Sequence, residues 1–170
     1  HKHLNLDLPY FDRHIPTSEN LARVLWNKLQ AQPDIGTLQR LSLYEDEDLC
    51  ADLTAEAGLE VATVTRRYSF TAVHDGHRGH TWDLFVSVHG PIHPETGMVT
   101  DIVALDRLVK DRVLHPFEGQ DLRTVLATPS VTGEYVAKAV WERISSAVPT
   151  GRLQLVKLVQ TRDLSYEYGG

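Results

Sequence analysis

Three histidines crowd around one short connection in the middle of the chain. The chain has nine histidines among 170 residues, and His74, His77 and His80 fall within one seven-residue stretch. Neutral imidazole nitrogen is a preferred ligand of zinc. If the turn places His77 inward, the three rings can converge on one metal ion. If it does not, they are ordinary loop histidines, and the neighbouring cation Arg78 opposes metal binding.

Two segments with strand character flank this connection and must position the histidines. Val61 to Val73 is a β-rich run, and His80 to Val88 is its partner. The tight connection between them predicts a hairpin with the histidines at one end. Met98 to Leu114 then predicts a helix, because apolar residues recur on one face. These residues are Ile102, Leu105, Leu108, Val109 and Val113.

The two ends of the chain repeat each other. At a constant offset of 115 residues, 19–53 match 134–168 without a gap, which is the signature of a repeated structural unit. Each copy predicts an apolar helix followed by alternating strands. Matching pairs are Glu19 with Glu134, Ala22 with Ala137, Trp26 with Trp141, Gly36 with Gly151 and Asp48 with Asp163. The alternative is two unrelated amphipathic helices, each followed by strands.

The repeat divides the chain into two units. Residues 61–170 predict strand, strand, helix, helix, strand, strand, which is a complete module, whereas 1–55 predict only helix, strand, strand. We interpret 56–60 as the linker. A helix with two strands buries too little surface to stand alone and leaves a bare sheet edge. We therefore expect another chain or residues upstream of His1 to complete it, and the start at His1 favours upstream residues.

Several motifs in one order resemble the 6-pyruvoyltetrahydropterin synthase and 6-carboxytetrahydropterin synthase family. The segments with this resemblance are Tyr68–His74, Gly79–Trp82 and Thr96–Ile102 in the complete module, and His1–Asn5, Pro16–Ala22 and Tyr44–Glu45 in the first part. Together they span nearly the whole chain. The resemblance implies the tunnelling fold, an α+β fold in which a four-stranded antiparallel sheet has two helices on one face. It also implies a homo-oligomer whose modules assemble into a β-barrel, which removes exposed sheet edges.

The activity that the resemblance implies is a zinc-dependent carbon–oxygen lyase acting on dihydroneopterin triphosphate, with active sites between modules. Of the family's three zinc-binding histidines, His74 matches the first and His80 the last. Arg78 stands at the middle position and cannot ligate a metal, so His77 is the third candidate ligand.

The family's proton-transfer groups are only partly present. His1 matches the catalytic histidine of the family's Asp-His dyad, whereas Glu118 and Gly119 take the two dyad positions in the complete module. Glycine cannot carry a proton. The family's catalytic cysteine has no counterpart in the short connection before His80, and Cys50 lies in a predicted strand, where we expect a structural role.

The pterin-binding carboxylate of the family matches Glu45. A carboxylate can accept hydrogen bonds from both the 2-amino group and the ring N–H of a pterin. The same resemblance makes Thr17 and Ser18 candidate substrate contacts. Gln160 replaces Glu45 in the second copy, where it keeps an acceptor but loses the charge. The alternative for Glu45 is an exposed turn carboxylate in an acidic run.

Composition excludes several classes of partner. The net charge is −6 and there is no long run of Lys and Arg, so a nucleic-acid partner is not expected. No apolar stretch approaches the roughly 20 residues of a membrane helix, and the first residues show no signal peptide. One cysteine cannot form an internal disulfide, which fits the cytoplasm.

Three functions remain open. The leading one is the zinc-dependent lyase, with His1 as proton shuttle and Glu45 as pterin anchor; we favour the 6-carboxy branch, which feeds 7-deazapurine (queuosine) synthesis. The second is a pterin-binding or scaffold homologue that kept the fold and lost the chemistry. The third is an enzyme acting on another pterin-like or purine-like substrate. We interpret the first part as the copy that retains the visible functional residues, His1 and Glu45, and the second copy as divergent.

Overall fold

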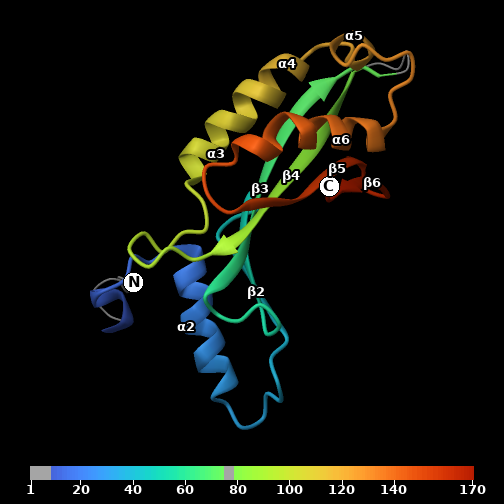
Figure 1. The fold of residues 1–170 in the computed structure, drawn as a ribbon. Coiled ribbons are helices and arrows are strands. Elements are labelled where there is room, and N and C mark those ends of the chain that lie inside the picture. The colour runs from blue at the N-terminus through green and yellow to red at the C-terminus, as the bar shows by residue number, and fades with distance from the viewer. Residues whose placement is uncertain (1–8, 75–78) are drawn as a thin grey trace.

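The computed structural model describes residues 9–74 and 79–170, which form one antiparallel sheet of six strands in chain order (Figure 1). The strands are β1 (Arg40–Tyr44), β2 (Leu49–Thr54), β3 (Val61–Ala72), β4 (His80–Pro91), β5 (Arg152–Thr161) and β6 (Leu164–Tyr168). β3 and β4 pair along their whole length, from Val61 opposite Pro91 to Ala72 opposite His80. This central hairpin confirms the strand–connection–strand prediction around the histidines.

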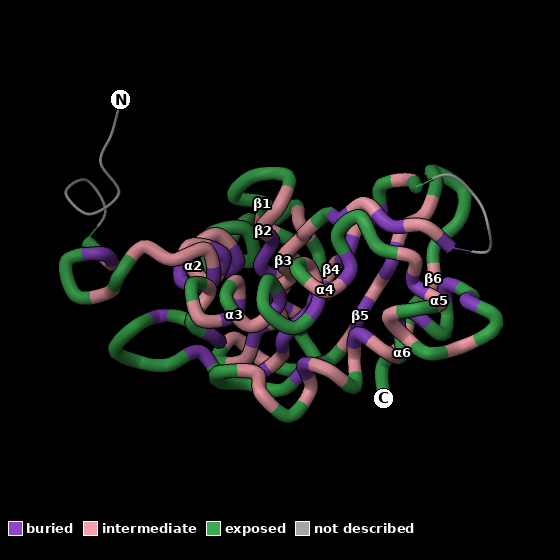
Figure 2. Tube along the Cα trace, turned by 90° about the horizontal axis from the view of Figure 1, so that it is seen from above, coloured by how far each residue is buried: buried purple, intermediate pink, exposed green. Residues whose placement is uncertain are grey.

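The helices cover one face of the sheet. They are the 3-10 turn η1 (Pro9–Asp12), α2 (Ser18–Gln30), α3 (Ile102–Val109), the π-helical turn η2 (Lys110–Leu114), α4 (His115–Phe117), α5 (Leu122–Val125), α6 (Gly133–Ile144) and the 3-10 turn η3 (Ser145–Ala147). α2 packs on β1 and β2, and α6 packs on β5 and β6. Alternate strand residues such as Leu53, Leu84 and Val156 point to this side and are fully buried. Figure 2 shows the buried residues in the middle of the molecule, surrounded by exposed loops.

The resemblance implied a four-stranded sheet, and this is corrected to six strands. β2 pairs antiparallel with β3, from Leu49 opposite Arg66 to Asp52 opposite Thr63. The first part therefore joins the sheet of the complete module, and the same chain covers the β2 edge that we expected another chain or upstream residues to cover. Within residues 9–74 and 79–170, β1 and β6 are the outer strands.

The repeated segments fold alike. α2 begins after Thr17, whose side chain accepts a hydrogen bond from the backbone N–H of Asn20. α6 begins after Thr132, which accepts one from the N–H of Tyr135. A threonine at this position satisfies one of the N–H groups that a helix start leaves unpaired. Each helix leads into an antiparallel hairpin, so the offset of 115 residues relates equivalent places in the fold.

The helix predicted from Met98 begins later, at Ile102. The side chain of Asp101 accepts a hydrogen bond from the N–H of Ala104 and caps the helix there. The N–H of Val99 donates instead to the carboxylate of Glu19, 2.9 Å away. A long-range contact with α2 thus keeps the segment before Asp101 out of the helix. No helix within the two described ranges is long and apolar enough to cross a membrane.

Candidate functional site

Glu45 lies at the end of β1, beside the start of α2. Its backbone N–H donates to the carbonyl of Leu49 at 3.0 Å, which closes the turn into β2. Its carboxylate oxygen Oε2 accepts a hydrogen bond from Oγ of Ser18 at 2.6 Å. Ser18 is the first residue of α2, and the positive end of a helix dipole favours a negative charge there. Glu45 is exposed, as its alternative predicted, but a side chain of another element holds it in place.

Thr17 and Glu19, the residues on either side of Ser18, both bond to the loop between β4 and α3. Oγ1 of Thr17 donates to the carbonyl of Gly97 at 2.6 Å. Gly97 has φ +71, and a Cβ there would lie 2.3 Å from the side-chain nitrogen of Asn20, so backbone conformation and space both require glycine. The predicted substrate contact Thr17 is therefore engaged in joining the two parts of the chain.

Glu19 belongs to this contact, and sequence analysis did not single it out. Only 5% of the residue is exposed, and its carboxylate accepts the N–H of Val99. Burial raises the pKa of Glu19, hydrogen bonds from the Val99 and Glu19 N–H groups oppose that rise, and the charge of Glu45 adds to it. The one signal in the sequence was the repeat with Glu134, and the structure leaves Glu134 exposed.

His74 and His80 meet at the top of the central hairpin. Their ring centroids are 4.9 Å apart, and both rings pack against Trp82. His77, the third predicted zinc ligand, lies outside the described residues, as does His1. Across 9–74 and 79–170 there is no group of three or more His, Cys, Asp or Glu side chains that could hold a metal.

Gln160 joins His74 at this end of the sheet. Its amide nitrogen lies 3.3 Å from Nε2 of His74, within hydrogen-bonding distance. Its carbonyl oxygen accepts a hydrogen bond from the hydroxyl of Tyr166 at 3.2 Å. The amide that replaces the predicted anchor is therefore bonded at both ends to side chains of this chain.

Glu118 lies away from the Glu45 turn, at the end of β3 that leads to His74. Its carboxylate accepts the N–H of Thr71 at 3.1 Å, and the N–H of Gly119 donates to the carbonyl of Thr71 at 2.7 Å. This segment covers the edge of β3 beyond the end of β2. The turn that contains Glu45 reaches only as far as Arg67, whose N–H donates to the carbonyl of Asp48. Thr71 is four residues further along, roughly 13 Å at the rise of a strand.

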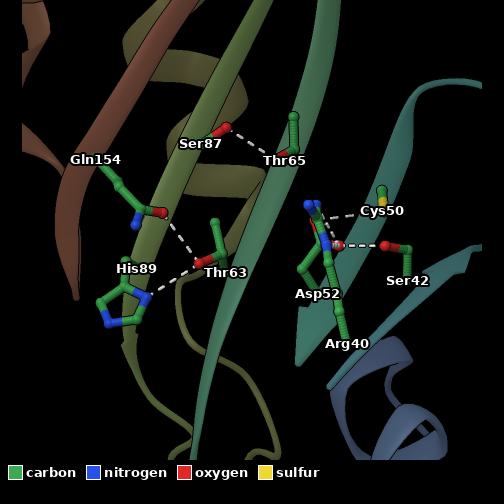
Figure 3. Close-up of polar contacts among 9 residues, drawn as sticks. All are labelled: Arg40, Ser42, Cys50, Asp52, Thr63, Thr65, Ser87, His89 and Gln154. Carbon is green, nitrogen blue, oxygen red and sulfur yellow. Dashed lines mark hydrogen bonds and ion pairs between the residues drawn. The ribbon is translucent and has the colours of Figure 1, made fainter. Parts of the chain in front are cut away.

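The opposite face of the sheet holds a cavity of about 820 Å³, which sequence analysis missed. Polar residues of its lining bond to one another and to neighbours outside it (Figure 3): Asp52 accepts from Arg40 at 2.8 Å and from Ser42. Thr63 donates to Gln154 at 3.0 Å and shares a hydrogen bond with His89 at 2.9 Å. The predicted site residues that the structure describes do not line this cavity.

Cys50 lies in the wall of the same cavity. Burial is the main cause that raises the pKa of its thiol to about 11, with the charge of Asp52 adding to the rise. The thiol therefore stays protonated at neutral pH and is a poor nucleophile. This agrees with the predicted structural role of the chain's one cysteine.

The fold defines an α+β protein whose antiparallel sheet has its helices on one face. The family model described as 6-pyruvoyl tetrahydropterin synthase matches residues 1–56 and 53–170. The chain belongs to this family.

Three relatives show how much of the chain one family member covers. The 6-pyruvoyl tetrahydrobiopterin synthase of Pongo abelii is 30% identical over 134 residues, covering 64% of this chain and 92% of the relative. That of Homo sapiens is 29% identical, with the same coverage. The solved structure of Caenorhabditis elegans 6-pyruvoyl tetrahydropterin synthase has a TM-score of 0.60 and 24% identity, covering 65% of this chain and 96% of that chain. About two thirds of this chain therefore matches one nearly whole relative.

Proposed function

We propose that this chain binds a pterin through Glu45 and Ser18 and acts as a 6-pyruvoyl- or 6-carboxy-tetrahydropterin synthase-like lyase on dihydroneopterin triphosphate. Family membership and the names of the relatives support the reaction class. The observation on which the proposal rests is the carboxylate of Glu45, held by Ser18 at the start of α2.

The geometry suits recognition of the pterin ring. Ser18 uses one lone pair of Oε2, so the other oxygen and the remaining lone pairs of Glu45 can accept the 2-amino and ring N–H groups. Hydrogen bonds to an ionised carboxylate are short and about twice as strong as neutral ones. Fixing the carboxylate through Ser18 also reduces the conformational entropy lost on binding.

Zinc dependence, with His74, His77 and His80 as ligands, is the part of the proposal that family membership suggests. A catalytic zinc site takes three protein ligands and keeps an open position. The described residues supply two imidazoles, and Nε2 of His74 is within hydrogen-bonding distance of Gln160. They do not by themselves fit the metal, so no step is assigned to it. His1, the proposed proton shuttle, lies outside the described residues.

A homo-oligomeric barrel in the cytoplasm completes the proposal. β1 and β6 are the outer strands of the described sheet and run in opposite directions. β6 of one subunit can therefore pair antiparallel with β1 of the next subunit, which would remove both exposed edges.

A non-catalytic pterin-binding protein is the second candidate. The observation that favours it is Gly119, which stands at the proton-transfer position of the complete module and carries no side chain to move a proton. Under this alternative the Glu45 site binds a pterin and leaves it unchanged.

Turnover separates the two candidates. The full-length protein is incubated with dihydroneopterin triphosphate, and release of inorganic triphosphate is measured alongside the zinc content. We expect release that stops with a chelator and returns with zinc. Glu45→Gln should lower it at least tenfold, whereas Glu47→Gln, an exposed carboxylate in the same turn, should leave it unchanged. Pterin binding without release would support the second candidate, and no pterin binding would contradict both.

A further inference from the structure

Three positions around the pterin anchor change together between the two copies of the repeat. In the first copy they are Ser18, Glu45 and Ala51. At the offset of 115 residues, their equivalents in the second copy are Gly133, Gln160 and Tyr166. A hydroxyl, a carboxylate and a methyl group are thus replaced by no side chain, an amide and a phenol.

The ring of Tyr166 packs where a side chain at residue 133 would lie, so the two residues are coupled by steric exclusion. A Cβ at Gly133 would lie 2.1 Å from the ring of Tyr166, a distance that no real contact permits. Gly133 is not among the residues with positive φ, so its backbone conformation does not require glycine. The missing side chain therefore makes room for the ring at the start of α6.

The phenol then bonds to Gln160, the residue at the position equivalent to Glu45. The hydroxyl of Tyr166 donates to the carbonyl oxygen of Gln160 at 3.2 Å. The amide nitrogen of Gln160 lies 3.3 Å from Nε2 of His74. A pterin would need these same amide atoms, so binding one there would have to break both internal contacts.

In the first copy no aromatic residue stands at the position equivalent to Tyr166. Ala51 is fully buried, and its single methyl group cannot reach Glu45. Ser18 takes the place of Gly133 and donates to the carboxylate. The carboxylate is exposed and its second oxygen faces no phenol from β2.

We propose that Tyr166 closes the anchor position of the second copy, so that of the two equivalent positions only Glu45 takes a pterin. The inference rests on the proposed pterin binding at Glu45. It assigns Tyr166 the role of an internal plug and Gly133 that of the space it needs.

Binding stoichiometry tests this inference. Neopterin is titrated into the full-length protein, and the number bound per chain is measured by equilibrium dialysis. At a neopterin concentration that just saturates the wild type, we expect one neopterin per chain for the wild type and well under one for Glu45→Gln, whose affinity is at least tenfold lower. Two per chain, or one retained by Glu45→Gln, would overturn the closure. No neopterin bound by the wild type would instead refute the proposed function, so the two failures are distinguishable.

A reopened second site gives the positive test. In the Glu45→Gln background, Gly133→Ser, Gln160→Glu and Tyr166→Ala together recreate the first-copy residues. We expect this variant to regain one neopterin per chain. The matched control is Tyr168→Ala in the same background, because it removes an aromatic ring from the same strand that packs on Trp141; at the same concentration it should bind no more than Glu45→Gln alone. A folded reopened variant that binds none would overturn the role of Tyr166, and the wild-type stoichiometry remains decisive if it does not fold.

Discussion

A carboxylate and an amide occupy equivalent strand ends in this chain, and their neighbours differ in kind. Glu45 has one hydroxyl donor, Ser18, and is otherwise exposed. Gln160 lies between a phenol and an imidazole and is satisfied inside the protein. An anchor that must bind a ligand needs acceptor capacity to spare, whereas a structural polar group needs none. The contacts therefore support the proposed binding at Glu45 rather than at Gln160, which they place in support of the sheet end.

The packing of Tyr166 on Gly133 predicts a strong coupling between these residues. Gly133→Ala should destabilise the protein by about 1–3 kcal/mol, because the added methyl group overlaps the ring. In a Tyr166→Ala background the same change should cost almost nothing, since the ring is gone. Urea unfolding of the four proteins of this double-mutant cycle measures the coupling. Equal costs of Gly133→Ala in both backgrounds would show that the ring lies elsewhere.

At the scale of elements, the start of α2 is the junction between the two parts of the chain. Thr17 and Glu19 bond to the loop between β4 and α3, while β2 pairs with β3. The Glu45 turn is therefore positioned by residues of both parts. A substitution in that loop that shifts the start of α2 should therefore also shift Glu45, although Glu45 itself bonds to Ser18 and Leu49 rather than to the loop.

Glu19 should make stability depend on pH. Burial raises its pKa above the ordinary value of 4.5, so the folded state holds this proton more tightly than the unfolded state. The stabilisation is fully present below pH 4.5 and is lost as pH rises through the folded-state pKa.

Glu19→Gln keeps an acceptor for Val99 and removes the titration. We expect its free energy of unfolding, measured in urea at steps from pH 4 to pH 8, to fall less with rising pH than that of the wild type. Glu134→Gln is the matched control, because the equivalent residue in α6 is exposed; it should follow the wild type. Parallel curves for Glu19→Gln and the wild type would contradict the assignment.

At the scale of the whole molecule, the features that could be predicted from the sequence are those that depend on local residue patterns. Apolar periodicity predicted α6, and the run of β-rich residues on both sides of His74 predicted the central hairpin. The motifs identified the family. The pairing of β2 with β3 was not predictable, because a helix with a hairpin exposes an edge that any strand could cover.

The candidate site was predictable only in part. Motif matching proposed Glu45, but its contact with Ser18 depends on how α2 packs against β1. The burial of Glu19 runs against the usual exposure of glutamate, and only the long-range contact with Val99 explains it. The closure at Gln160 requires the register of β5 and β6, in which Leu158 lies opposite Tyr166. Each of these contacts is set by tertiary packing rather than by local sequence.

The affinity of the full-length protein for neopterin, compared between the wild type, Glu45→Gln and Glu47→Gln, tests the central claim most directly. Hydrogen bonds to a charged group contribute about 1.5–3 kcal/mol, so Glu45→Gln should raise the Kd roughly 10- to 150-fold. Glu47→Gln should match the wild type, because its carboxylate lies in the same turn but is paired with Arg67. An unchanged Kd for Glu45→Gln would contradict the account.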